Sequence, residues 1–182
     1  FSVDAGADET ATFDAARAGR ESAGCNPAAF VGGETLTLEI DNDGITQTIT
    51  FLAGDITVAL VAQRINNLIE NGYCEVTGAG TEIKVWSDKY GTGSKVEIIG
   101  GTGRAALGLA IGDTSGTGDV VDIRAVTALE VQTRVVADCA SLSITEVTIS
   151  AGAVTFATPT IGIAGSIQCQ AASTADGATK CD

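Results

Sequence analysis

The stretch that decides the fold reads TLTLEIDNDGITQTITF over residues 35–51 and TVALVAQRINNLI over residues 57–69. In the first string, polar and apolar residues alternate on both sides of Asp43-Gly44, as in two half-buried strands joined by a tight turn. In the second, apolar residues recur at helical spacing behind Thr57, a residue type that caps helices. The two strings predict a β-hairpin followed by a helix that stops at Asn71-Gly72.

A similar order of elements returns further along the chain. Three short strands are expected after the helix, over residues 73–77, 82–87 and 94–99. Thr127-Ala-Leu-Glu130 then forms a capping box that opens a second helix, and alternating residues at 146–148, 154–156 and 167–169 repeat the three strands that follow the first helix. The two parts of the chain agree in the spacing of their elements, in the apolar face of the helix and in the parity of the strands, so we predict an internal duplication. The expected fold class is α+β: two tandem repeats, each one helix packed on a small, mainly antiparallel sheet, with an N-terminal arm.

The duplication divides the chain into three parts. Residues 1–33 form the N-terminal arm, residues 34–112 the first repeat, and residues 113–182 a degenerate second copy with a tail. The second copy has only residues 119–123 to place before its helix, so its sheet is short of one strand. Because unpaired sheet edges are normally covered or paired, we expect the arm to add to that edge in its own chain or in a neighbour. Removal of residues 1–20 is then expected to leave the first repeat folded and to abolish incorporation of the protein into its assembly.

Composition and charge argue against several classes of function. The 182 residues carry 10 basic and 23 acidic side chains, a net charge of −13, and no histidine. A field of that sign repels phosphate backbones, which argues against nucleic acid as a partner. Without histidine the chain lacks the usual general base and the commonest ligand of transition metals. No apolar run is long enough to span a membrane. We therefore expect no enzymatic activity, no cofactor, no metal and no membrane partner.

Several turn and core residues resemble those of a known module. They are Leu36-Thr-Leu-Glu-Ile-Asp41 with Gly44 and Thr48-Ile-Thr-Phe51, Ile65-Asn-Asn67, Ile83-Lys-Val-Trp-Ser87, Gly91-Thr-Gly-Ser94 and Ala105-Ala-Leu-Gly-Leu109. The pattern resembles the tandem α+β modules of tailed-bacteriophage structural proteins and, more distantly, the IN module of flagellins and flagellar hook-associated proteins. It covers residues 34–131 well. The resemblance implies a repeated scaffold on a large extracellular or virion assembly, and it brings no catalytic residues with it.

The function expected on these grounds is structural. We expect a non-enzymatic virion protein of a tailed phage, capsid-decorating or tail-associated, that binds other virion proteins and copies of itself as a homo-oligomer within a large assembly. The alternative is a processed, secreted filament or adhesin subunit of a bacterial surface. A third class, a carbohydrate-binding or carbohydrate-acting domain, needs clustered exposed aromatic residues, for which the sequence offers Trp86 and Tyr90. The expected location is the virion or, for the alternative, the outside of a cell.

Candidate interface residues come from the few aromatic side chains. Strand parity points Val85 inward and Trp86 outward, so Trp86 either packs under a neighbouring loop or anchors an interface, with Tyr90 beside it as a second candidate. Phe1 and Phe13 are the aromatic candidates of the arm.

The five cysteines are further candidates. Cys139 closes the second helix and Cys169 lies on the last strand, both at core-facing positions, which allows a disulfide if their Cα atoms lie within about 7 Å. The alternative is that Cys74, Cys139 and Cys169 are small buried hydrophobes. Cys25 and Cys181 lie in the terminal segments, where we expect contacts between chains in an oxidising environment.

The loop Asp41-Asn42-Asp43-Gly44 admits two interpretations. Its carboxylates suggest a calcium loop, but the alternating oxygen ligands and the distant glutamate of an EF-hand are missing. Asp and Gly are also the residues that a hairpin turn requires. We therefore expect a turn at this position.

Overall fold

The computed structural model describes residues 2–3, 10–41, 43–140, 142–157 and 167–168. The chain forms two compact units. The central unit comprises residues 14–125, and the terminal unit is built from both ends of the chain, residues 1–13 and 126–182. In sequence, the central unit is therefore inserted between the two parts of the terminal unit.

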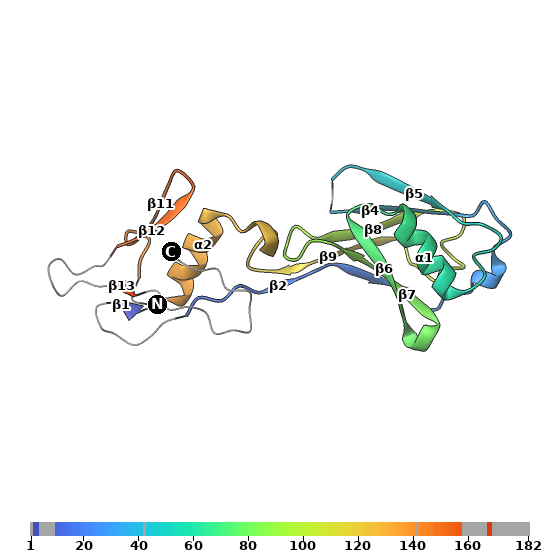
Figure 1. Ribbon diagram of the computed structural model, residues 1–182, viewed down its shortest axis with the longest axis horizontal. Helices are drawn as coiled ribbons and strands as arrows, with labels where there is room; N and C mark the ends of the chain where they lie inside the picture. The colour runs from blue at the N-terminus through green and yellow to red at the C-terminus, as the bar shows by residue number, and fades with distance from the viewer. Residues whose placement is uncertain (1, 4–9, 42, 141, 158–166, 169–182) are drawn as a thin grey trace. The chain divides into compact units, whose positions relative to one another are not determined.

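The central unit contains two larger antiparallel sheets (Figure 1). The four-stranded sheet has the order β5-β4-β8-β9, and its strands are β4 (Thr35–Ile40), β5 (Thr46–Thr50), β8 (Lys95–Gly100) and β9 (Gly112–Ser115). The three-stranded sheet has the order β3-β7-β6, and its strands are β3 (Gly19–Glu21), β6 (Gly72–Thr77) and β7 (Glu82–Ser87). A short pair joins β2 (Ala15–Ala16) to β10 (Thr117–Gly118).

Alternation fixes which side of β4 faces the core. Leu36, Leu38 and Ile40 are buried, whereas the Thr and Glu residues between them are half-exposed. β4 pairs antiparallel with β5 on one side and with β8 on the other. The predicted hairpin over residues 35–51 is thereby confirmed.

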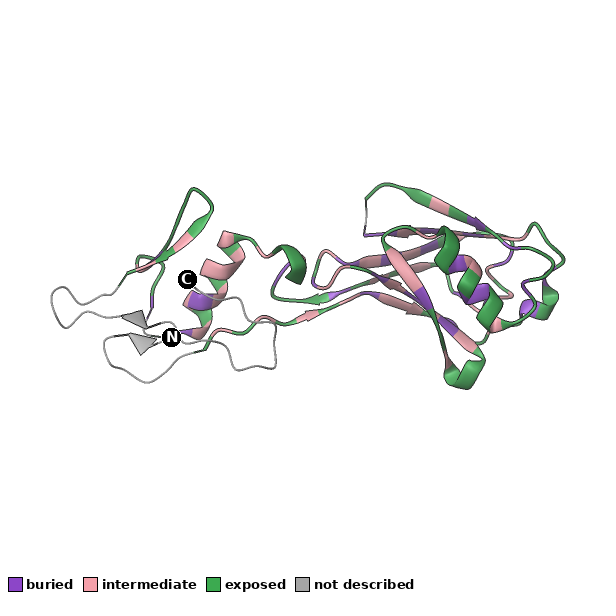
Figure 2. Cartoon of the chain, in the orientation of Figure 1, coloured by how far each residue is buried: buried purple, intermediate pink, exposed green. Residues whose placement is uncertain are grey.

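Helix α1 (Val58–Leu68) follows the hairpin. The Thr57 hydroxyl caps it by accepting the Leu60 N–H at 3.2 Å, as predicted. Val61, Ala62 and Ile65 are its buried residues, and Figure 2 shows that most of the other residues of the helix are exposed. Asn71 then takes a left-handed conformation with φ 61°, close to the start of β6.

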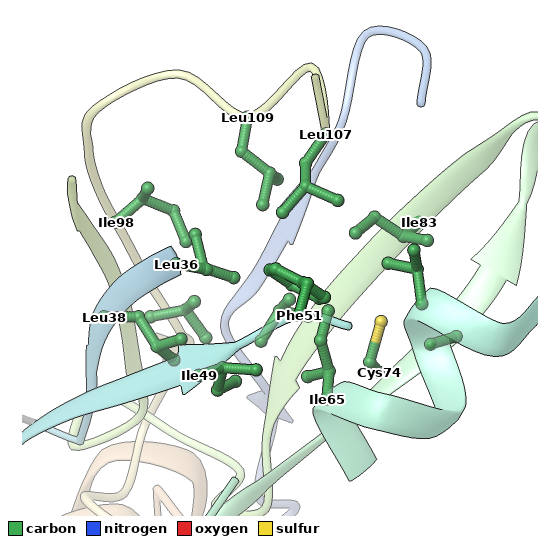
Figure 3. Packing of buried hydrophobic residues seen from close by; sticks show 14 of the residues in the cluster. Leu36, Leu38, Ile49, Phe51, Ile65, Cys74, Ile83, Ile98, Leu107 and Leu109 are labelled. Atoms are coloured by element: carbon green, nitrogen blue, oxygen red, sulfur yellow. The ribbon is translucent and has the colours of Figure 1, made fainter. Parts of the chain in front are cut away.

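One hydrophobic core fills the central unit. It combines side chains from α1 and both large sheets with Leu107 and Leu109 from the connection after β8. Figure 3 shows Phe51 in the middle of this core, between Leu36 and Ile65. Phe51 also stacks on Phe30, with ring centroids 4.8 Å apart. Most of the strand and helix positions predicted to face inward meet here.

The terminal unit also packs a helix on a hairpin. Helix α2 (Ala128–Asp138) begins with the predicted capping box, in which the Thr127 hydroxyl accepts the Glu130 N–H at 3.3 Å and the Glu130 carboxylate accepts the Thr127 N–H at 2.7 Å. The helix packs against the antiparallel pair of β11 (Val147–Ser150) and β12 (Ala153–Phe156).

A short strand pair and a small core complete the described part of the terminal unit. β1 (Ser2–Val3) pairs antiparallel with β13 (Ile167–Gln168). The core cluster contains the buried residues Val135, Cys139, Leu142 and Val147. The predicted α+β class, with a helix on antiparallel strands in each part, is confirmed. Neither helix in the described part of the chain is long and apolar enough to cross a membrane.

The two units divide the chain at other positions than the predicted parts do. Of the predicted arm, residues 14–33 belong to the central unit, because β3 extends its three-stranded sheet. Residues 113–125 belong to it as well, because β9 extends the four-stranded sheet. The strand expected over residues 119–123 does not form, and the Val120 carbonyl instead accepts the Thr92 N–H at 2.8 Å. The internal duplication stays a prediction.

Candidate functional site: the N-terminal segment and the side chains it covers

Residues 14–26 are bonded to several segments of the central unit, and β3 within them is an edge strand of the three-stranded sheet. β3 pairs antiparallel with β7, which places Gly19 opposite Trp86. The contact continues past β3, where the Ser22 N–H donates to the Ile83 carbonyl at 2.9 Å and the Cys25 N–H to the Thr81 carbonyl at 2.8 Å. This part of the predicted arm is therefore an edge strand of the central unit.

Arg17 lies over three aromatic rings. Its guanidinium carbon is 4.4 Å from the ring centroid of Trp86, 4.7 Å from that of Tyr73 and 5.3 Å from that of Tyr90. These rings are the single tryptophan and both tyrosines of the chain. A cation within about 6 Å of a ring centroid is attracted by the negative face of the ring. We call Arg17, Tyr73, Trp86 and Tyr90 the arginine–aromatic cluster.

Polar side chains complete this cluster. Lys84 Nζ lies 4.2 Å from the ring centroid of Trp86 and 3.4 Å from the Glu21 carboxylate. The indole N–H of Trp86 donates to the Glu75 carboxylate at 2.6 Å. Burial raises the pKa of the Tyr73 phenol, which therefore stays neutral at physiological pH. Arg17 thus lies against aromatic rings of the chain, and Lys84 lies against both an aromatic ring and a carboxylate.

The register of β6 and β7 explains why these side chains meet. Tyr73 is directly opposite Trp86, and cross-strand neighbours share one face of a sheet. Cys74 and Val85, one position along on each strand, are buried in the core on the other face. Trp86 therefore points away from the core, as predicted, and it is half-buried under the N-terminal segment.

Within the cluster, Arg17 packs on the three rings, and the three aromatic residues are half-buried. A ring face that packs against a guanidinium or ammonium group is not free to stack on a sugar. Arg17 thus occupies one face of each of the three rings. The proximity of Trp86 and Tyr90 to Arg17 is observed, whereas their role as interface residues stays a prediction.

Residues 10–13 belong to the terminal unit and contact its second part, residues 126–182. Ala11 packs against its core cluster, and the Thr12 N–H donates to the Asp138 carboxylate at 3.2 Å. Asp138 is the last residue of α2 and pairs with Arg134 at 2.7 Å. With the β1–β13 pair, these contacts join the start of the arm to the second copy within one chain. Phe13 is half-buried, and Phe1 lies outside the described residues.

The described cysteines lie in or beside the two cores. Cys74 is buried in the central unit, where burial raises its thiol pKa to about 12, and burial also raises the pKa of the half-buried Cys25. Both thiols are free, and at physiological pH they are protonated and poorly nucleophilic. Cys139 is fully buried in the terminal unit. Cys169 and Cys181 lie outside the described residues, so the Cys139–Cys169 disulfide and the contacts of Cys25 and Cys181 between chains stay predictions.

The loop after β4 is a turn whose carboxylates bind protein groups. Asp43 accepts the Ile45 N–H at 2.8 Å, and the buried Asp41 accepts the Ser87 hydroxyl at 2.5 Å. Within the part of the chain that the structure describes, no three His, Cys, Asp or Glu side chains converge to hold a metal ion.

Sequence reasoning missed Arg17 and Tyr73 as members of a site. The sequence contains a signal for Tyr73, because pairing the predicted strands 73–77 and 82–87 as a hairpin places Tyr73 opposite Trp86. Arg17 had none, since it lies in a segment without periodicity and its partners are far along the chain.

Comparison with known proteins gives two distant structural similarities. No family model matches the sequence, and no curated protein matches it. The crystal structure of the D1-D2-D3 domains of the flagellar cap protein FliD from Escherichia coli is 15% identical, with a TM-score of 0.41 over 60% of this chain and 39% of that chain. The D2-D3 domains of the same protein are 15% identical, with a TM-score of 0.39 over 67% of this chain and 77% of that chain. The chain thus spans 39% of the length of the first structure, and neither structure is of a phage protein.

Proposed function

We propose that this protein is a non-enzymatic structural subunit of an extracellular assembly. The main support is the two-stranded hairpin of β11 and β12 in the terminal unit, which pairs with no further strand within the described residues. A hairpin of two strands is marginally stable by itself in water. We therefore expect contacts with other chains to complete the terminal unit.

Exposed apolar side chains of the terminal unit support the same proposal. Leu129 is 62% exposed, Ile144 58% and Ile149 38%. A strand from another chain can add to the hairpin of β11 and β12 through backbone hydrogen bonds.

Two kinds of assembly fit this role. One is a tailed-phage particle, in which the protein decorates the capsid or belongs to the tail. The other is a filament or adhesin on a bacterial surface. Fractionation of the native source separates them, because the protein would be recovered with purified phage particles in the first case and with sheared surface filaments in the second. Recovery only as a soluble monomer would contradict both.

A pair of substitutions tests whether the terminal unit makes the contacts. Ile144→Asp places a charge on an exposed apolar side chain of that unit and should abolish incorporation into the assembly. Val31→Asp makes the same kind of change at an 81% exposed side chain of the central unit and is the matched control. Circular dichroism checks that both variants fold. Equal incorporation of the two variants would contradict the assigned role of the terminal unit.

A further inference from the structure

The outer edge of β5 carries backbone groups that the four-stranded sheet does not use. β5 is the last strand in the order β5-β4-β8-β9 (Figure 1). Its pairing with β4 continues in the bond from the Phe51 N–H to the Glu34 carbonyl at 2.8 Å. Because alternate residues of a strand bond to opposite sides, the N–H and C=O groups of Thr46, Thr48 and Thr50 point away from β4. Within the described residues, β5 has no second partner strand.

The other edges of the two large sheets are covered, short or charged. On the free side of β6, the N–H and the carbonyl of Cys74 bond to the side-chain amide of Asn66 at 2.6 and 2.8 Å. β9 has four residues and includes Asp113, and β3 has three residues and includes Arg20 and Glu21. Covers, short strands and charges keep the edges of sheets from pairing with other chains. β5 has none of these protections, since its five residues, TQTIT, include neither a charge nor a proline.

The distribution of charge favours a second copy of this chain as the occupant of the β5 edge. The net charge of the chain is −13, yet residues 45–54 contain no charged side chain. A basic strand of another protein would find no carboxylate on β5 to pair with. Two copies of so acidic a chain repel each other, and they meet with least repulsion along an uncharged edge.

We propose that β5 pairs antiparallel with β5 of a second copy, around a two-fold axis at Thr48. This register places Thr48 opposite its own copy and Thr46 opposite Thr50, so every outward N–H and carbonyl of the three residues gains a partner. Threonine pairs are favourable neighbours across two strands, and residues 46–50 place no like charges opposite each other. The four-stranded sheets of two central units then form one continuous sheet. This interface goes beyond the proposed function, which assigns contacts to the terminal unit.

Disulfide trapping with the full-length chain tests the register. In the two-fold pair, the Cα atoms of the two copies of residue 48 lie about 5.5 Å apart, within the range of a disulfide. Thr48→Cys should therefore link two chains when the concentrated protein is mildly oxidised. Thr46→Cys is the matched control, because residue 46 is also exposed on β5, but its two copies lie about 14 Å apart in this register.

Peptide mapping separates the new disulfide from those of the native cysteines. A glutamate-specific protease cuts the denatured chain at Glu39 and Glu70, which leaves Cys25 and Cys74 outside the peptide of residues 40–70. This peptide then contains a single thiol, at residue 48. Two copies of the peptide linked to each other can come only from two chains, and mass spectrometry of the unreduced digest identifies them.

The linked peptides decide what occupies the β5 edge. Self-linked peptides from Thr48→Cys, without those from Thr46→Cys, support the two-fold pairing. Their absence from Thr48→Cys overturns it. Equal amounts from both variants also overturn it, because the contact then has no fixed register. A link from residue 48 to Cys169 or Cys181 of the same chain overturns it as well, because the C-terminal residues of the chain itself would then occupy the edge.

Sedimentation of the unoxidised chain gives a second measurement, and circular dichroism checks that the variants fold. Thr48→Lys places two ammonium groups opposite each other and should abolish the pairing, although it makes the chain less negative. Thr117→Lys changes the net charge equally at an exposed threonine of β10 and should leave the pairing intact. Added salt should strengthen the association, because it screens the repulsion between acidic chains. Equal association of the two lysine variants would overturn the pairing.

Discussion

Gly19 makes room for the indole ring of Trp86 on the outer face of the three-stranded sheet. Gly19 lies opposite Trp86, and an added Cβ would come closer than 3.0 Å to Cε3 and Cζ3 of the indole ring. Without a side chain, the strand leaves space for the ring to lie across it. Arg17, in the same segment, packs over that ring as well. Gly19 and Trp86 are therefore complementary in size, and the packing depends on both.

Gly19→Ala should lower the free energy of unfolding of the central unit by about 1–3 kcal/mol, because the indole ring must leave its packed position. Urea unfolding followed by circular dichroism and by the fluorescence of Trp86, the single tryptophan, measures the change. Gly100→Ala is the control, since it also lies in a strand but has nothing within 4 Å of an added Cβ. Equal stability of the two variants would mean that the ring does not pack against β3.

At the scale of elements, one buried carboxylate connects the two large sheets of the central unit. Asp41, directly after β4, accepts the Ser87 hydroxyl at 2.5 Å and the Lys95 N–H at 3.1 Å. Ser87 ends β7 in the three-stranded sheet, and Lys95 begins β8 in the four-stranded sheet. Lys89 Nζ lies 3.8 Å from the second carboxylate oxygen. The ends of three strands are thus held by one side chain.

Asp41→Ala should destabilise the central unit by about 2–4 kcal/mol, because the buried Ser87 hydroxyl and the partly buried Lys95 N–H lose their acceptor. Part of this cost comes from the left-handed backbone at Asp41, φ 61°, which Asn tolerates better than Ala. Asp41→Asn, which keeps an acceptor oxygen, should therefore cost less. Asp43→Ala removes an exposed carboxylate of the same turn and should cost less than about 1 kcal/mol. Equal unfolding midpoints in urea for Asp41→Ala and Asp43→Ala would contradict the connecting role.

At the scale of the whole molecule, the N-terminal residues take part in both units. Ala18 is fully buried in the core cluster of the central unit, and β3 covers one edge of β7. The expectation that the first repeat folds without residues 1–20 is therefore revised. That truncation would remove Ala18 and most of β3, and it would leave the β7 edge unpaired.

Removal of residues 1–13 should leave the stability of the central unit unchanged within about 1 kcal/mol, because these residues belong to the terminal unit. Removal of residues 1–20 should lower it by about 3 kcal/mol or more, through the lost core residue and the lost edge strand. Urea unfolding followed by circular dichroism, with limited proteolysis, compares the two truncated chains. A central unit equally resistant in both would contradict the role of β3.

Local patterns in the sequence determined the elements and the fold class. Alternation over residues 35–51 and 82–87 predicts strands that the structure contains, and the caps at Thr57 and Thr127 predict the starts of both helices. These signals join residues that are neighbours in a strand or within one helical turn, so a single sequence carries them.

Only the tertiary structure decided where the residues without a pattern belong. Residues 14–26 take their conformation from backbone bonds to β7 and to other segments of the central unit, and backbone groups are the same whatever the side chain. The arginine–aromatic cluster depends on that pairing, because Arg17 reaches its three rings only after β3 has added to β7. The boundary between the two units at Asp14 has the same origin. It lies where the hydrogen bonds of the chain change from those of the terminal unit to those of the central unit. No spacing of residues along the chain encodes which sheet has an open edge.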